Sequence, residues 1–225
     1  MQFERSVKTI YNRVMKKYIV PITISLLSLA VFLIIAYYVS HYESLPFDVS
    51  ICQAVYAARS QMLTVFFKSI TYTANWQTIS LICIVLLFFK RTRKTYGYPL
   101  AGVSTLSLIL YTTLKGVFAR PRPDITLHLI YEGGFSFPSG HSMTSFVFYG
   151  FLAILLARNL VNKRKANQIA ALLCILIFLV GFSRVYLGVH YPTDVLGGFF
   201  LGNAVLFLIL FGNNVYLTSV KKDIL

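Results

Sequence analysis

Charged residues are scarce in this sequence, and acidic residues most of all. Only 12% of the 225 residues are charged, seven of them Asp or Glu, whereas 57% are hydrophobic. A soluble domain of this size carries roughly twice that charged fraction. Several uncharged runs are about as long as the roughly 20 apolar residues that cross a bilayer. The composition therefore excludes a soluble protein and predicts an all-α, polytopic membrane protein.

Cysteines are also few, and their positions exclude a disulfide framework. Cys52, Cys83 and Cys174 are an odd number without metal-ligand spacing. Two of them fall inside apolar runs, where cysteine behaves as a small apolar residue.

Positive charge is in excess, with a net charge of +14 at pH 7. Such a charge is also typical of nucleic-acid-binding proteins, but here its distribution argues against that function. Most lysines and arginines lie in short segments between uncharged runs, where positive charge sets membrane topology. We expect no nucleic-acid partner.

The uncharged runs predict six spans in a single integral membrane domain over residues 1–225. The first run is too long for the apolar part of a cleaved signal peptide, so we interpret it as a retained span. Segment 41–68 contains charged residues, and its apolar residues recur at helical spacing. We expect an interfacial amphipathic helix there, with an ordinary outer loop as the alternative. The predicted spans cover about residues 18–40, 69–89, 95–115, 140–157, 166–184 and 194–217.

Lysines and arginines are distributed unequally between the two sides of these spans. Basic residues precede the first span and follow the second, fourth and sixth, whereas the other side has nearly as many acidic as basic residues. The positive-inside rule therefore places both termini in the cytoplasm. The loops after the first, third and fifth spans are then extracytoplasmic.

Three blocks of polar residues lie at span ends on this predicted outer side. Ionisable groups at membrane depth are costly and mark functional sites by default. The blocks are Lys-x6-Arg-Pro at 115–123, Pro-Ser-Gly-His at 138–141 and Ser-Arg-x5-His-x3-Asp at 183–194.

Three cations in these blocks, Lys115, Arg122 and Arg184, predict a site for a multiply charged anion. The planar arginine fork matches phosphate oxygens, and lysine supplies a compact charge. Ser139 and Gly140 open a predicted helix, whose free N–H groups and dipole also favour an anion. Together these groups are suited to stabilise a transferring phosphoryl group.

Two histidines supply the remaining chemistry. Asp194 can fix the tautomer of His190 and leave its other ring nitrogen free to attack. His141 can protonate the leaving oxygen and later activate water. We expect no metal and no cofactor, because the three cations would repel a divalent ion.

Each residue also has a structural interpretation when taken alone. Lys115 and Arg122 would be membrane anchors, Ser139 a helix N-cap and Asp194 a first-turn acid. An anion transporter and a non-catalytic lipid-binding scaffold are the rival functions. A transporter would place its charges near the bilayer midplane, whereas here they cluster at one face. A scaffold would not need His190 paired with Asp194.

All three blocks resemble the type 2 phosphatidic acid phosphatase superfamily, without departure from its pattern over residues 115–194. The resemblance implies metal-independent catalysis, with His190 forming a phosphohistidine, Asp194 as its partner and His141 as general acid. It further implies phosphate binding by Lys115, Arg122, Ser139, Gly140 and Arg184.

The compact length, without a large outer domain, resembles the bacterial phosphatidylglycerophosphatase B group, in particular its Gram-positive members. We therefore expect a multi-pass cell-membrane enzyme whose partners are membrane lipids and whose active site is extracytoplasmic. The resemblance implies phosphatidylglycerophosphate as first substrate and undecaprenyl diphosphate as the alternative. We interpret four further residues as parts of a solvated loop, with head-group selection as the alternative: Arg120, Asp124, His128 and Glu132.

Overall fold

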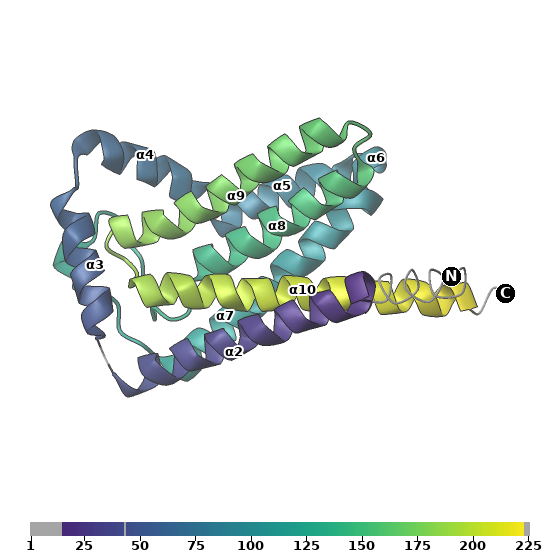
Figure 1. Cartoon of the computed structure of the whole chain (residues 1–225). Helices are drawn as coiled ribbons and strands as arrows, with labels where there is room; N and C mark the ends of the chain where they lie inside the picture. The colour runs from purple at the N-terminus through teal and green to yellow at the C-terminus, as the bar shows by residue number, and fades with distance from the viewer. Residues whose placement is uncertain (1–14, 43, 223–225) are drawn as a thin grey trace.

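The computed structural model describes residues 15–42 and 44–222, and all regular structure in these ranges is helical (Figure 1). Five helical segments are long and apolar enough to cross a membrane. Five of the six predicted spans coincide with these segments. Their main helices are α2 (Val20–His41), α7 (Tyr98–Phe118), α8 (Gly140–Asn159), α9 (Lys163–Tyr186) and α10 (Pro192–Lys222).

The predicted span 69–89 is not one straight helix. Helix α4 (Gln61–Tyr72) and helix α5 (Trp76–Phe88) pass the span criterion only as a pair, which is bent by 46° at its break. Asn75 is extended there, with φ −65° and ψ 148°, and begins α5 as its N-cap residue. The 13 residues of α5 extend about 20 Å, less than the hydrocarbon thickness. The predicted span thus coincides with a bent helix pair rather than with one continuous helix.

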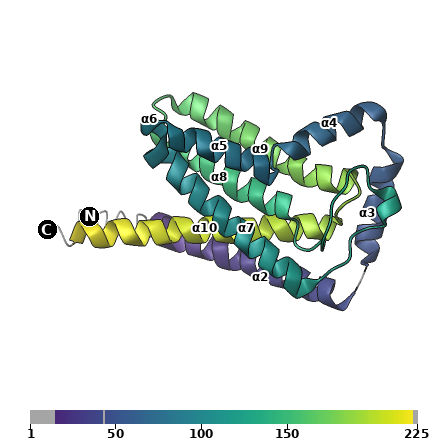
Figure 2. The ribbon, with the colours of Figure 1, turned by 180° about the vertical axis from the view of Figure 1, so that it is seen from behind.

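Segment 41–68 forms two helices rather than the single one predicted. Helix α3 (Pro46–Ala57) ends before Ser60, which is extended and whose Oγ accepts a hydrogen bond from Leu63 N. This side-chain cap begins α4 in a new direction. Figures 1 and 2 show α3 lying across the ends of the long helices. Its location in the membrane interface stays a prediction.

Short elements complete the helical order. Helix α6 (Lys90–Thr92) and the π-helical turn η2 (Arg93–Gly97) join α5 to α7. A second π-helical turn, η1 (Met15–Ile19), precedes α2, and the 3-10 turn η3 (Ile125–Leu127) lies in the loop after α7.

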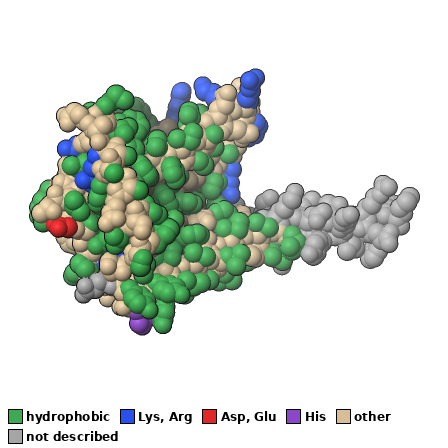
Figure 3. Space-filling model, turned by 60° about the vertical axis from the view of Figure 1, so that its left-hand side comes forward, with side chains coloured by type: hydrophobic (Ala, Val, Ile, Leu, Met, Phe, Trp, Pro, Cys, Tyr) green, Lys and Arg blue, Asp and Glu red, His purple; other side chains and the backbone are tan. Residues whose placement is uncertain are grey.

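Helix α8 lies at the centre of the bundle, and its side chains Met143, Val147 and Phe148 are fully buried. Helix α10 packs against α2, α8 and α9. A hydrogen bond also joins α10 to α2. Ser25 Oγ donates to Ala204 O at 2.8 Å, as is common where spans pack through small residues. Figure 3 shows apolar side chains over most of the visible surface, as lipid contact requires.

The direction of the chain brings the three polar blocks to one end of the bundle. Helices α7 and α9 end there, and helices α8 and α10 begin there, beside α3 (Figures 1 and 2). The basic segments 90–94 and 158–165 lie at the opposite end, where α5 joins α7 and α8 joins α9. The three blocks therefore lie together and form one candidate site, because each is located at a helix end on the same side of the bundle.

Candidate active site

Helix ends position each residue of the three blocks. Lys115 lies in the last turn of α7, and Arg184 in the last turn of α9. Ser139 is the N-cap of α8, and Asp194 lies in the first turn of α10. All of the predicted site residues thus meet at the same end.

His190 lies in the turn between α9 and α10, fully buried. The N–H groups of Val189 and His190 donate to Arg184 O at 3.2 and 3.3 Å, which folds the turn back onto α9. Gly188 makes this fold possible, because its φ is 80° and an added Cβ would lie 2.4 Å from Leu127 O. The sequence block is therefore a compact turn that directs the imidazole into the bundle.

The two ring nitrogens of His190 have different partners. Nδ1 lies 3.3 Å from Asp194 Oδ2, and Nε2 lies 3.2 Å from Arg122 Nη1. A guanidinium can only donate, so Nε2 must accept and the ring proton must reside on Nδ1. The lone pair of Nε2 consequently faces the cationic side of the site.

Burial, together with the charges of Arg122, Lys115 and Arg184, lowers the pKa of His190 well below its ordinary value. The imidazole is therefore neutral near pH 7, the state in which a histidine nitrogen is nucleophilic. The same electrostatic effect shows that the three cations of the different blocks act on one ring.

Asp194 contacts both His190 and the start of its own helix. Its Oδ2 also accepts a hydrogen bond of 2.8 Å from Tyr191 N, as an acidic residue does when it reaches back to the start of its helix. The carboxylate thus caps α10 and orients His190 at the same time. Pro192 between the two residues begins the helix rather than interrupting it.

Arg184 has one donor available for a further acceptor. Nη1 donates to Thr71 Oγ1 at 2.8 Å, and Nη2 forms an ion pair with Glu132. Its buried Nε has no acceptor within the described residues. A buried unpaired donor is costly, and an anionic ligand would satisfy it.

Arg122 and Lys115 are held by backbone carbonyl groups. Arg122 donates to the carbonyls of Gly133, Gly134 and Val189 at 2.9, 3.0 and 2.7 Å. Lys115 Nζ donates to Phe135 O at 2.8 Å. These neutral acceptors orient the two cations without cancelling their charge.

Ser139 and Gly140 open α8 at the site. Ser139 Oγ accepts hydrogen bonds from Ser142 N and Oγ at 3.4 and 2.9 Å, so the expected N-cap role is present. Gly140 packs under Tyr111, whose ring would lie 2.9 Å from an added Cβ. The first N–H groups of α8, which lack intrahelical acceptors, therefore remain close to the site.

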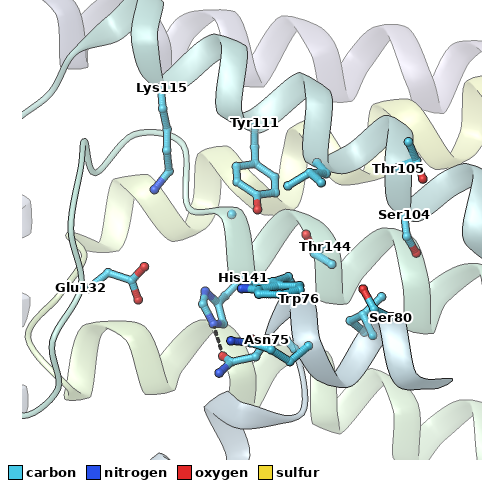
Figure 4. A pocket seen from close by; sticks show the side chains of 15 residues that line it. Asn75, Trp76, Ser80, Ser104, Thr105, Tyr111, Lys115, Glu132, His141 and Thr144 are labelled. Atoms are coloured by element: carbon cyan, nitrogen blue, oxygen red, sulfur yellow. Dashed lines mark hydrogen bonds between the residues drawn. The ribbon is translucent and has the colours of Figure 1, made fainter. Parts of the chain in front are cut away.

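His141 contacts a residue that the sequence analysis missed. Its Nε2 lies 2.6 Å from Asn75 Oδ1, at the break between α4 and α5 (Figure 4). A polar residue between two apolar segments was the available signal for that break. His141, Lys115 and Glu132 all point toward the same cavity in Figure 4.

This cavity has a volume of about 330 Å³ and extends from His141 between α5 and α7. Hydroxyl groups line much of it, in contrast to the apolar outer surface of the spans. They belong to Ser80, Ser104, Thr105, Tyr111 and Thr144.

Two of the four residues assigned to a solvated loop are instead parts of the site end. Arg120 is 2% exposed and binds Asp194. Glu132 is partly buried and pairs with Arg184 and, at 3.8 Å, with Arg122. The loop interpretation was wrong for both, because their partners come from distant helices. Asp124 and His128 form their hydrogen bonds within the loop itself.

Comparison with known proteins identifies the family of the chain. A family model for the PAP2 superfamily matches residues 96–214. Phosphatidylglycerophosphatase B of Bacillus subtilis is 36% identical over 167 residues, which cover 72% of this chain and 81% of that protein. An undecaprenyl-diphosphatase of Sulfolobus acidocaldarius is 35% identical over 132 residues, covering 56% and 59%.

A solved structure shares the fold. The crystal structure of a transmembrane PAP2 type phosphatidylglycerolphosphate phosphatase from Bacillus subtilis superposes with a TM-score of 0.75 at 30% identity, covering 85% of this chain and 96% of that one. The match extends beyond the three polar blocks to nearly the whole bundle. The chain therefore belongs to the PAP2 superfamily, as a multi-pass membrane protein with the fold of its lipid phosphatases.

Proposed function

We propose that the chain is a metal-independent lipid phosphatase that acts through a phosphohistidine. The observation that carries this proposal is the environment of His190, whose Nδ1 faces Asp194 while Nε2 faces the cations. Such an imidazole is neutral, oriented and directed at the place where a phosphate would bind. Lys115, Arg122, Arg184 and the start of α8 at Ser139 and Gly140 supply the phosphate-binding groups.

In the first step, Nε2 of His190 forms a bond to phosphorus while the bond to the lipid oxygen breaks. Arg122 Nη1 transfers its hydrogen bond from Nε2 to a phosphate oxygen. His141 donates a proton to the departing oxygen, and the free lipid alcohol leaves. The cations stabilise the charge on the equatorial oxygens.

In the second step, water replaces the histidine. His141, now unprotonated, takes a proton from the water as its oxygen attacks phosphorus. The P–N bond breaks, inorganic phosphate leaves, and His190 recovers its lone pair. Asp194 holds the Nδ1–H throughout and stabilises the charged ring when phosphorus is bound to Nε2.

Phosphatidylglycerophosphate is the substrate that suits the cavity beside His141. Its leaving group is a glycerol hydroxyl, and the lining hydroxyl groups, such as those of Thr144 and Tyr111, suit a polyol. Acyl chains can remain in the bilayer, because the phosphate site lies at the span ends. The similarity to Bacillus subtilis phosphatidylglycerophosphatase B supports the same substrate.

Undecaprenyl diphosphate is the second candidate. The similarity to an undecaprenyl-diphosphatase, at 35% identity over 132 residues, favours it. Its leaving group is a phosphate rather than a glycerol, so the hydroxyl-lined cavity suits it less well. We expect phosphatidic acid to be accepted and water-soluble phosphates to be poor substrates.

Phosphate release from these lipids by purified protein in detergent tests the proposal. His190→Ala should abolish release, chelators should have no effect, and vanadate should inhibit as a pentacoordinate mimic. Loss of activity in chelator with recovery on adding a divalent ion would overturn the metal-free mechanism. A larger kcat/KM for undecaprenyl diphosphate than for phosphatidylglycerophosphate would reverse the substrate order.

We also propose that the site faces the outside of the cell and that both termini are cytoplasmic, on the basis of the basic segments at the opposite end. Single cysteines at two well-exposed positions test this in a variant without native cysteines. Tyr131 is 92% exposed at the site end, and Val161 is 96% exposed at the other end. An impermeant thiol reagent on intact cells should label Tyr131→Cys and not Val161→Cys. The reverse labelling would invert the topology.

A further inference from the structure

Arg120 directly follows the turn that ends α7 and enters the interior of the site end. Ala119 takes a left-handed conformation with φ of 45°, which ends the helix and redirects the chain. The Arg120 guanidinium lies over the Tyr191 ring, 4.3 Å from its centroid. Burial of an unpaired cation is costly, so this side chain requires partners of opposite charge.

Two buried carboxylates supply that charge. Arg120 Nη1 donates to Asp194 Oδ1 at 2.6 Å, and Nη2 donates to Asp48 Oδ2 at 2.8 Å. Asp48 belongs to α3 and is 0% exposed. It also accepts hydrogen bonds from the N–H and hydroxyl groups of Thr193, at 2.9 and 2.6 Å. Helix α3 is therefore bonded to the first turn of α10.

The two oxygens of Asp194 consequently have separate partners. Oδ1 accepts from Arg120, whereas Oδ2 accepts from Tyr191 N and faces His190 Nδ1. A carboxylate bound on both oxygens cannot rotate freely about its Cβ–Cγ bond. Since Asp194 orients the imidazole, a fixed Asp194 also fixes the direction of His190 Nε2.

We propose that Arg120 and Asp48 are positioning residues for His190. Arg120 fixes the Asp194 carboxylate, and Asp48 holds Arg120 from α3. This inference rests on the proposed function, in which His190 attacks phosphorus. Like Arg184, Arg120 has a buried Nε without an acceptor within the described residues. Arg120 alone faces two carboxylates, whereas Arg122 and Arg184 share Glu132, so its role differs from the phosphate-binding role proposed for those two residues.

Steady-state kinetics of Arg120→Gln separates positioning from substrate binding. We expect kcat to fall about 100-fold, the scale for displacement of a reacting group by about 1 Å. KM and the vanadate inhibition constant should stay within about threefold of wild type, because the phosphate-binding cations are intact. Arg59→Gln is the matched control, since Arg59 binds Tyr186 O at 3.0 Å and contacts neither carboxylate. It should keep wild-type kcat.

An unchanged kcat in Arg120→Gln would overturn the proposal. A large rise in KM at constant kcat would instead identify Arg120 as a substrate ligand, and would overturn it as well. Absence of activity in the wild-type protein would contradict the proposed function, a different outcome.

A measurement without turnover tests positioning directly. Nitrogen-15 NMR of the histidine rings should find His190 with its proton on Nδ1 in wild type and a mixture of tautomers in Arg120→Gln. His190→Gln provides the assignment. An unchanged tautomer would contradict the inference.

The double variant Asp48→Asn/Arg120→Gln guards against loss of fold, because it removes one negative and one positive charge together. If Asp48 acts through Arg120, the kcat of the double variant should equal that of Arg120→Gln. Multiplication of the two single losses would show independent roles and would refute the proposed connection.

Discussion

Two clusters of charged residues lie at the site end and differ in how their positive charge is compensated. Arg120 lies between Asp48 and Asp194, so two carboxylates face one guanidinium. Arg122 and Arg184 share Glu132 as an acidic partner, and Lys115 forms no ion pair within the described residues. We call the first cluster saturated, because two carboxylates neutralise its single cation. We call the second cluster undersaturated, because its three cations outnumber its one acidic partner.

This difference separates the proposed positioning arginine from the proposed phosphate-binding arginines more clearly than burial does. Arg120 and Arg184 are almost equally buried, at 2% and 1% exposed. A saturated cation gains nothing from an added anion, whereas an undersaturated one attracts it. The comparison yields four tests.

The largest effect is expected when the undersaturated cluster loses a cation. Arg184→Gln should lower kcat/KM by about 10³-fold, the upper scale for removing one preorganised donor from a transition state. The thermal midpoint should change little, because the remaining cations repel each other less. Phosphate release and thermal unfolding in detergent measure both quantities, with Arg59→Gln as control. A large drop in the midpoint would make Arg184 a structural residue.

The saturated cluster should show the opposite pattern in stability. Arg120→Gln leaves two buried carboxylates without their cation and should cost about 3 kcal/mol of stability. The midpoint of thermal unfolding should fall clearly below that of Arg184→Gln. Adding Asp48→Asn should recover part of the loss, since it removes one unpaired charge. Equal midpoints for Arg120→Gln and Arg184→Gln would erase the distinction between the clusters.

Glu132 partly neutralises the undersaturated cluster and should compete with substrate phosphate. Glu132→Gln should lower KM and the vanadate inhibition constant about two- to fivefold, a modest effect because the ion pair is partly exposed. Asp124→Asn is the matched control, since that carboxylate bonds to Thr126 within its own loop. A higher KM in Glu132→Gln would mean that Glu132 contacts the substrate.

The smallest effect concerns the titration of His190. Burial and then the charge of Arg122 lower its pKa, so the folded protein should keep the ring neutral below pH 6.5. The unfolded chain binds this proton near pH 6.5. This group's contribution to stability is therefore present above pH 6.5 and is lost as pH falls below it. NMR titration should show a higher pKa in Arg122→Gln, and an unchanged pKa would contradict the electrostatic coupling.

The spans were predictable because lipid contact imposes a simple pattern. Predicted segments 95–115 and 166–184 correspond to α7 (Tyr98–Phe118) and α9 (Lys163–Tyr186). The break inside segment 69–89 has a physical cause. The span was predicted from the length of an uncharged run, and Asn75 is uncharged, so the run appeared unbroken. The extended backbone of Asn75 nevertheless separates α4 from α5.

The site was predictable where its residues stand at helix ends in short blocks. Charge distribution placed these blocks on one side, and the order of helices brings them together. Arg120 could not be assigned in this way, because its partners Asp48 and Asp194 lie 72 and 74 positions away. The same holds for the contact of Asn75 with His141, 66 positions apart.

The sequence by itself determined the membrane class, most of the candidate spans and the three polar blocks that form the proposed site, because these follow from local composition and spacing. Only the tertiary structure decided which cations are neutralised by carboxylates and which are not. Charge compensation depends on distances between side chains from different helices. The difference between Arg120 and Arg184 therefore became visible only when α3, α4 and the loop after α7 were packed against α9 and α10.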